Sequence, residues 1–320
     1  MKNKCSVLYY FMLSLLLIGC NNSNSGSVNS SSLSDEESSV VSSEISSEIN
    51  SSIDNRETAQ VIVMAGQSNM EGHSWTSKLY EKADESMHNY YRKGFNNTKI
   101  MFHCNNGTNI SEEFTSVKAG QGYGTGSFGP EVGIAEKLYK INYDKPVYLV
   151  KYALGATGLH DRWNVNDNNS LYYEMLNYVD EQIITLEEEG YKVEIKGFFW
   201  MQGENDSSST AAVSSYYDNL TNLVTSFRDY YEDFYGVEDK GIAFVDAGIS
   251  DCASWKHYAL INDSKKQFAE SDPSKNYYFS TIDNKLEYDK DNTDYYHFDA
   301  LSEIKLGELF ISQLLDNGWL

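Results

Sequence analysis

The chain has 320 residues, of which 41% are hydrophobic and 22% are charged, a composition usual for globular proteins, and its length suits one large domain or two small ones. It carries 47 Asp and Glu against 25 Lys and Arg, a formal net charge of −22. Because such an acidic surface repels phosphate backbones, we expect no binding to nucleic acid.

The first 57 residues are expected to precede the folded domain. A basic start leads into an apolar run too short for an ordinary membrane-spanning helix, as in an export signal. The run ends in LIGC, which resembles a bacterial lipobox and implies a signal peptide over residues 1–19 and a lipid on Cys20. Residues 20–57, rich in Ser, Asn and Glu, are expected to form a disordered tether. We therefore expect a protein anchored at the bacterial cell surface.

From residue 58 onward, apolar runs alternate with longer amphipathic stretches. The runs interpreted as buried strands are residues 61–65, 100–104, 147–154, 195–201 and 242–247, with 277–282 as a weaker sixth. The stretches interpreted as helices are residues 133–140, 172–189, 212–231, 256–269 and 301–315. This alternation predicts one α/β domain over residues 58–320, a three-layer α/β/α sandwich with a mostly parallel central sheet. In such sheets, ligands bind beyond the carboxyl ends of the strands.

Ser68 lies where the first predicted strand ends, in the sequence GQSNM. A nucleophilic serine needs an exposed hydroxyl, a base and backbone N–H groups directed at the developing oxyanion, and a strand-to-helix turn can supply the first and third. The second glycine of the GxSxG nucleophile elbow is missing, so an α/β-hydrolase fold is not indicated. Taken alone, Ser68 is better interpreted as a cap of the next helix.

Asp294 and His297 are separated by two residues and lie just before the last predicted helix. A turn at that spacing can place a carboxylate against the imidazole, which fixes its tautomer and raises its pKa. Asp291 and Asp299 are alternatives for the carboxylate, and Asp299 is also suited to capping the helix. His73 and His160 are alternatives for the base.

Two further segments place polar groups at strand ends. Gln202, Glu204 and Asn205 follow a very apolar strand, and amide side chains at that point can donate to an oxyanion or simply cap the following helix. Gly155 ends another strand and can bring its N–H close to a ligand.

Taken together, GQSNM, GSFGPEVGIAEKL, YALGATGL, FWMQGEND and DYYH resemble the SGNH hydrolases. More narrowly, they resemble the sialate O-acetylesterase-like branch, which includes acetyl xylan esterases of carbohydrate esterase family six. The resemblance covers residues 59–320. It implies an SGNH-type fold and a carbohydrate O-acetylesterase that needs no cofactor.

The resemblance also assigns roles to residues. It implies Ser68 as nucleophile, His297 as base and Asp294 as the acid that orients it. The oxyanion hole would comprise the N–H groups of Ser68 and Gly155 with the side chain of Gln202 or Asn205, of which Gln202 is preferred. The residues expected to support the site or shape a sugar pocket are Gln67, Asn69, Glu204, Arg162 and Trp163.

The partner and the substrate are less narrowly determined. We expect the protein to be a monomer. We also expect no bound metal, because the sequence contains no metal-ligand spacing. Cys104 and Cys252 are the one pair left for a disulfide. The substrate classes are acetylated plant polysaccharide, which is slightly favoured, O-acetylated sialic acid and bacterial wall glycan. A sialate carboxylate would need Lys151 or Arg162. The alternative functions are a non-catalytic glycan-binding lipoprotein and, ranked lowest, a lipid esterase.

Overall fold

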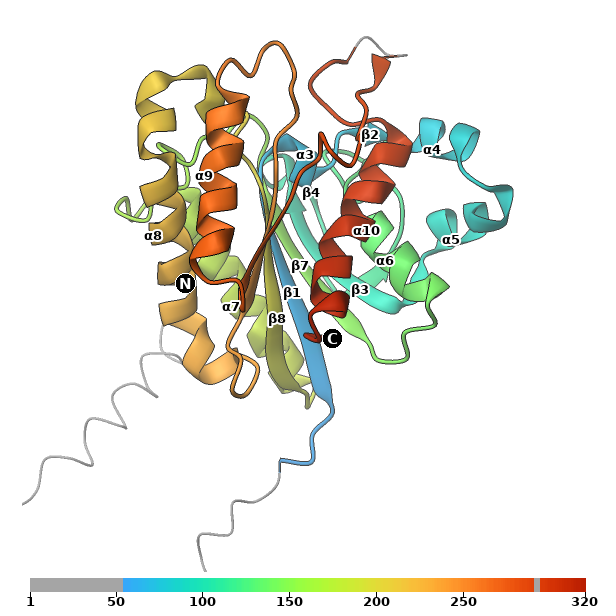
Figure 1. The fold of residues 1–320 in the computed structure, drawn as a ribbon. Helices are drawn as coiled ribbons and strands as arrows, with labels where there is room; N and C mark the ends of the chain where they lie inside the picture. The colour runs from blue at the N-terminus through green and yellow to red at the C-terminus, as the bar shows by residue number, and fades with distance from the viewer. Residues whose placement is uncertain (1–53, 291–293) are drawn as a thin grey trace, which may run out of the picture. The chain divides into compact units, whose positions relative to one another are not determined.

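A mostly parallel sheet lies between two layers of helices in the computed structural model, which describes residues 54–290 and 294–320 (Figure 1). Its strands run in the order β10-β9-β8-β1-β7-β3-β4, with β5 also paired to β3. All pairings are parallel except those of β4 and β5 with β3. The bounds are β1 Thr58–Gly66, β3 Phe95–Cys104, β4 Asn109–Ile110, β5 Thr115–Val117, β7 Val147–Ala153, β8 Lys192–Met201, β9 Ala243–Ala247 and β10 Asn276–Phe279.

The predicted α/β/α sandwich is confirmed, and each predicted strand and helix is present with bounds that differ by a few residues. The long helices are α6 Glu131–Lys140, α7 Leu171–Glu188, α8 Thr210–Tyr235, α9 Tyr258–Ser271 and α10 Ala300–Asp316. The short elements not predicted are α3 Ser68–Glu71, α4 Thr76–Lys82, α5 His88–Lys93, a β2 Ser74–Trp75 and β6 Ser127–Phe128 pair, and 3-10 turns at Glu85–Met87, Asn105–Gly107 and Asp206–Ser208. These elements are too short to show a hydrophobic period.

Helices α6 and α10 cross at close range because each has a glycine at the contact. A Cβ on Gly133 would overlap the carbonyl oxygen of Ile304, and one on Gly307 would overlap that of Pro130. The close approach fixes α10, and therefore the loop just before it, against the body of the domain.

A buried ion pair lies between β7 and α6. Lys151 Nζ lies 2.8 Å from Glu131 Oε2, and neither side chain is exposed. Lys151 also donates to the carbonyl oxygens of Glu71 (3.1 Å) and Gln121 (2.7 Å), which ties α3 to the sheet. The expectation that Lys151 is available for a sialate carboxylate is therefore wrong.

The structure tests only some of the predictions made for the N-terminal segment and the cysteines. The expected signal peptide, the lipid on Cys20 and nearly all of the tether fall outside the described residues and stay predictions. None of the helices in residues 54–290 and 294–320 is long and apolar enough to cross a membrane.

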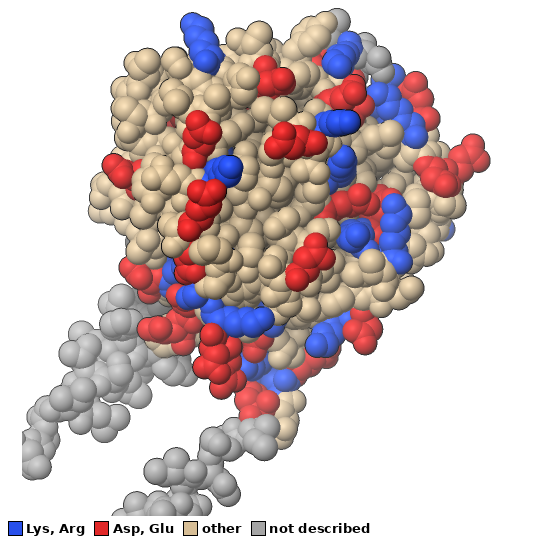
Figure 2. All heavy atoms as spheres, viewed as in Figure 1, with Lys and Arg blue, Asp and Glu red and all other residues tan. Residues whose placement is uncertain are grey.

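Cys104 and Cys252 are both buried and unpaired, so the possible disulfide does not form. On the face shown in Figure 2, acidic and basic side chains are interspersed.

Candidate active site

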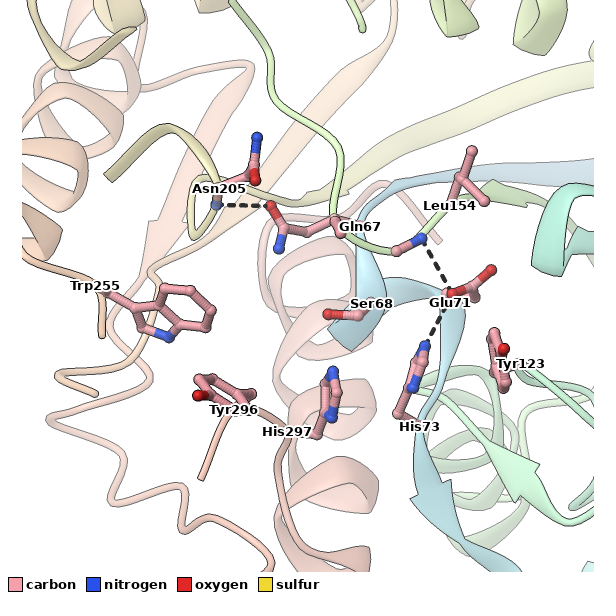
Figure 3. A pocket seen from close by; sticks show the side chains of 12 residues that line it. Gln67, Ser68, Glu71, His73, Tyr123, Leu154, Asn205, Trp255, Tyr296 and His297 are labelled. Carbon is pink, nitrogen blue, oxygen red and sulfur yellow. Dashed lines mark hydrogen bonds and ion pairs between the residues drawn. The ribbon is translucent and has the colours of Figure 1, made fainter. Parts of the chain in front are cut away.

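A cavity of about 490 Å³ opens beyond the carboxyl ends of the central strands. Its lining comes from the turn after β1 and the short helix α3 with the residues that follow it, the loop between β5 and β6, the loops after β7, β8 and β9, and the loop before α10. The lining residues are Gln67, Ser68, Glu71, His73, Tyr123, Leu154, Gly155, Ala156, Asn205, Trp255, Tyr296 and His297 (Figure 3).

Ser68 is the first residue of α3, immediately after the central strand β1. The strand ends at Gly66, where a side chain would overlap the carbonyl oxygen of Met201 on β8, and the chain turns at Gln67. Gln67 occupies the N-cap position, so Ser68 does not cap the helix. In Figure 3 the Ser68 hydroxyl lies between Gln67 and His297.

Asp294 and His297 form the pair that their spacing predicts. His297 Nδ1 lies 2.7 Å from Asp294 Oδ2, while Asp294 Oδ1 accepts the N–H groups of Tyr296 and His297 at 2.9 and 3.1 Å. Burial raises the pKa of Asp294, but these hydrogen bonds outweigh it and the pKa lies below its usual range. Of the alternatives, Asp299 caps α10 by accepting from Ser302 N, and Asp291 lies outside the described residues.

The histidine loop is attached to the serine helix through Asn69. Asn69 Nδ2 donates to Glu204 Oε1 at 2.8 Å, and its Oδ1 accepts the N–H of Phe298 at 3.3 Å. Ser74 Oγ also donates to the carbonyl oxygen of Phe298 at 2.6 Å. Glu204 thus holds Asn69, which in turn holds the loop that carries His297.

A second acid–histidine pair, which the sequence analysis missed as a pair, lies against the first. His73 Nε2 is 2.9 Å from Glu71 Oε2, and the His73 ring stacks on His297 with centroids 4.3 Å apart. Burial and the charge of His73 lower the pKa of His297 below its ordinary value, although Asp294 acts in the opposite direction. The expectation of a raised pKa is therefore wrong, because it considered only the carboxylate.

Two of the expected oxyanion donors are already engaged by protein groups. The Gly155 N–H donates to Glu71 Oε2 at 3.1 Å. Gln202 is fully buried outside the cavity lining, and its Nε2 donates to Asp206 Oδ2 (2.6 Å), Thr157 O (3.0 Å) and Gln67 Oε1 (3.2 Å). The preference for Gln202 is not supported by this geometry, since its amide has no direction left toward Ser68.

The two residues expected to shape the sugar pocket do not line it. Arg162 is exposed outside the cavity lining, and Trp163 is fully buried, where it packs edge-on against Trp200 and donates to Thr157. His160, an alternative base, lies outside the cavity and contacts Ser215. In residues 54–290 and 294–320 no group of three or more His, Cys, Asp and Glu is placed to hold a metal ion.

Aromatic rings that sequence analysis missed line the cavity on two sides. Trp255 and Tyr296 lie 5.5 Å apart, and Tyr123 lies 4.6 Å from His73. Figure 3 shows these rings on either side of the stacked histidines. Tyr296, next to His297, was within reach of a sequence argument, whereas Tyr123 and Trp255 come from distant loops.

Comparisons with known proteins identify the family and the fold. A family model described as "Carbohydrate esterase, sialic acid-specific acetylesterase" matches residues 58–316. Among solved structures, a protein from Arabidopsis thaliana is 18% identical, with a TM-score of 0.58 over 81% of this chain and 98% of that one. NanS is 15% identical, with a TM-score of 0.55 over 82% of this chain and 98% of that one. No curated protein matches the sequence. The two structural likenesses show the fold, and the family match shows that this chain belongs to the sialic acid-specific acetylesterase family of carbohydrate esterases.

Proposed function

We propose that the protein removes O-acetyl groups from a carbohydrate through an acetyl-enzyme formed on Ser68. The observation that carries the proposal is the Asp294–His297 pair, whose histidine lines the same cavity as Ser68. A serine is a weak nucleophile until a neighbouring base takes its proton, and the base must be oriented by a third group. The three residues come from β1–α3 and the loop before α10, and Asn69 joins these segments.

The proposed reaction has two halves. His297 accepts the Ser68 proton as Oγ attacks the acetyl carbonyl, and then donates that proton to the sugar oxygen as the ester C–O bond breaks. In the second half His297 takes a proton from water, whose oxygen attacks the acetyl carbonyl. Acetate leaves as the proton returns to Ser68. Asp294 stabilises the imidazolium in both halves.

We further propose that the acetylated sugar is neutral. A sialate carboxylate would be expected to pair with Lys or Arg, and neither occurs among the twelve residues that line the cavity. Lys151 is buried in its ion pair and Arg162 lies outside the lining. The rings of Trp255, Tyr296 and Tyr123 instead offer flat apolar surfaces, which suit the carbon faces of a sugar ring.

A panel of native substrates tests the proposal. We expect acetate release from acetylated xylo-oligosaccharides with a kcat/KM at least ten times that for O-acetylated sialic acid. An aryl acetate serves as the reference for intrinsic turnover. A preference for the sialic acid would contradict the neutral substrate, and turnover of the aryl acetate alone would contradict both sugar classes.

The pH dependence tests the role of His297. The base must be neutral to accept a proton, so kcat/KM is expected to rise with pH and level off. Because the pKa of His297 is lowered, the midpoint should lie below about 6.5, the value for an unperturbed histidine. His73→Phe keeps a stacked ring but removes the charge, and should move the midpoint upward. A midpoint above 6.5 in the wild-type pH profile would contradict the assignment of His297, with its lowered pKa, as the base.

The principal alternative is a non-catalytic glycan-binding lipoprotein on the same fold. The Ser68, His297 and Asp294 set argues against it, because a binding protein has no need of a serine beside an oriented base. We also infer a cell-surface location, with lipid on Cys20, from the lipobox alone.

A further inference from the structure

We propose that the side-chain amide of Gln67 donates a hydrogen bond to the oxyanion formed when Ser68 attacks the acetyl group. The inference rests on the proposed function and deepens it, since it names a group that contacts the reacting atoms. Gln67 lines the cavity immediately before Ser68. In this proposal Gln67, rather than Gly155 or Gln202, is the second oxyanion donor beside the Ser68 N–H.

The orientation of the Gln67 amide is fixed by three donors. Its Oε1 accepts from Gln202 Nε2 at 3.2 Å, Gly203 N at 3.4 Å and Asn205 N at 3.3 Å. All three donors carry N–H groups, so a flipped amide would set its own N–H groups against them. The nitrogen must therefore face away from the loop after β8.

That nitrogen is a donor with a free direction into the cavity. Gln67 is only 2% exposed, yet no described residue accepts a hydrogen bond from its Nε2. Figure 3 shows Nε2 on the cavity side, away from Asn205 and above Ser68. An N–H donor held by other groups before reaction is what an oxyanion hole requires, because no reorganisation is needed when charge develops.

The competing donors are directed elsewhere. The Gly155 N–H is held by Glu71, and Gln202 is held by Asp206 and Thr157. The Asn205 side chain points away from Ser68 in Figure 3, and its Nδ2 lies 3.0 Å from the position of a Cβ built on Gly158. The Ser68 N–H, at the first position of α3, has no intrahelical acceptor and completes the pair with Gln67.

The main test replaces Gln67 with glutamate, which keeps an acceptor for the Gly203 and Asn205 N–H groups but removes the donor. We expect kcat for an aryl acetate to fall about 10²–10³-fold with little change in KM. Gln67→Met, of similar length and without charge, should lose a comparable factor, which separates loss of the donor from added charge. The matched control is Gln60→Glu, a buried glutamine at the other end of β1, which should keep wild-type kcat.

A second measurement separates a catalytic from a structural role. A simple alkyl boronic acid forms an anionic tetrahedral adduct with a nucleophilic serine, so its inhibition constant should rise in both Gln67 variants by a factor comparable to the fall in kcat. The affinity for the deacetylated sugar, which carries no oxyanion, should stay within about threefold of wild type.

The outcomes are distinguishable from failure of the proposed function. If both Gln67 variants keep kcat within threefold while Asn205→Ala loses 10² or more, Asn205 is the donor and this inference is wrong. If both variants lose kcat and deacetylated-sugar affinity together, with a lowered thermal midpoint, Gln67 is structural and the inference also fails. Full activity of Ser68→Ala would overturn the acetyl-enzyme itself, whatever Gln67 does.

Discussion

Ser68→Ala and His297→Ala are each expected to lower kcat for an aryl acetate by about 10⁴–10⁶-fold, and the double variant should be scarcely worse than either. The reason is that nucleophile and base act in one step: without the imidazole, the hydroxyl keeps its proton, and without the hydroxyl, the imidazole has nothing to activate. Asp294→Ala should lose less, because it removes the group that orients the base. Initial rates at a pH on the plateau provide the measurement.

His160→Ala is the matched control for this series. It removes a histidine that contacts Ser215 and does not line the cavity, so the kcat of this variant should remain within threefold of wild type. Each variant must retain the wild-type circular dichroism spectrum. Wild-type turnover by a folded Ser68→Ala would favour the glycan-binding alternative.

Lys151→Met is expected to lower the free energy of unfolding by about 3–5 kcal/mol, because it leaves the Glu131 carboxylate buried without its partner. Methionine also cannot donate to the carbonyl oxygens of Glu71 and Gln121, which accept hydrogen bonds from Lys151. Urea denaturation followed by circular dichroism measures the loss.

Two companion variants give this prediction its controls. Lys151→Met combined with Glu131→Gln removes both charges, and should recover part of the stability. Lys192→Met removes a partly exposed pair with Glu194 and should cost about 1 kcal/mol or less. If Lys151→Met costs no more than Lys192→Met, the buried pair has no special role in stability.

The strands were predictable because both faces of this sheet are covered. A strand that is buried on both faces needs an unbroken apolar run, and such runs are recognisable in the sequence at residues 61–65 and 195–201. The Asp294–His297 contact was predictable for a similar reason, since two residues of spacing make a turn. In each case neighbours along the chain supply the whole signal.

The hydrogen bonds that occupy the Gly155 N–H and the Gln202 amide could not be predicted from neighbouring residues in the sequence. Whether the Gly155 N–H is free depends on the Glu71 carboxylate, which reaches it from a different strand end. Gln202 and Asn205 both follow β8, and only the third dimension shows which one borders the cavity. Trp163 faces the core although the two residues before it are exposed. A loop this short has no hydrophobic period that would indicate which way a side chain points.

The hydrogen bond between Asn69 and Phe298 joins positions 229 apart in the chain. The nucleophile is therefore synthesised long before the base, and the loop that carries His297 leads directly into α10, which packs closely on α6. Contacts of such long range also slow folding, because the chain must close a large loop before they form. A nascent or truncated chain that ends before residue 294 thus has Ser68 without Asp294 and His297, so hydrolytic activity reports that synthesis and folding have passed the loop before α10.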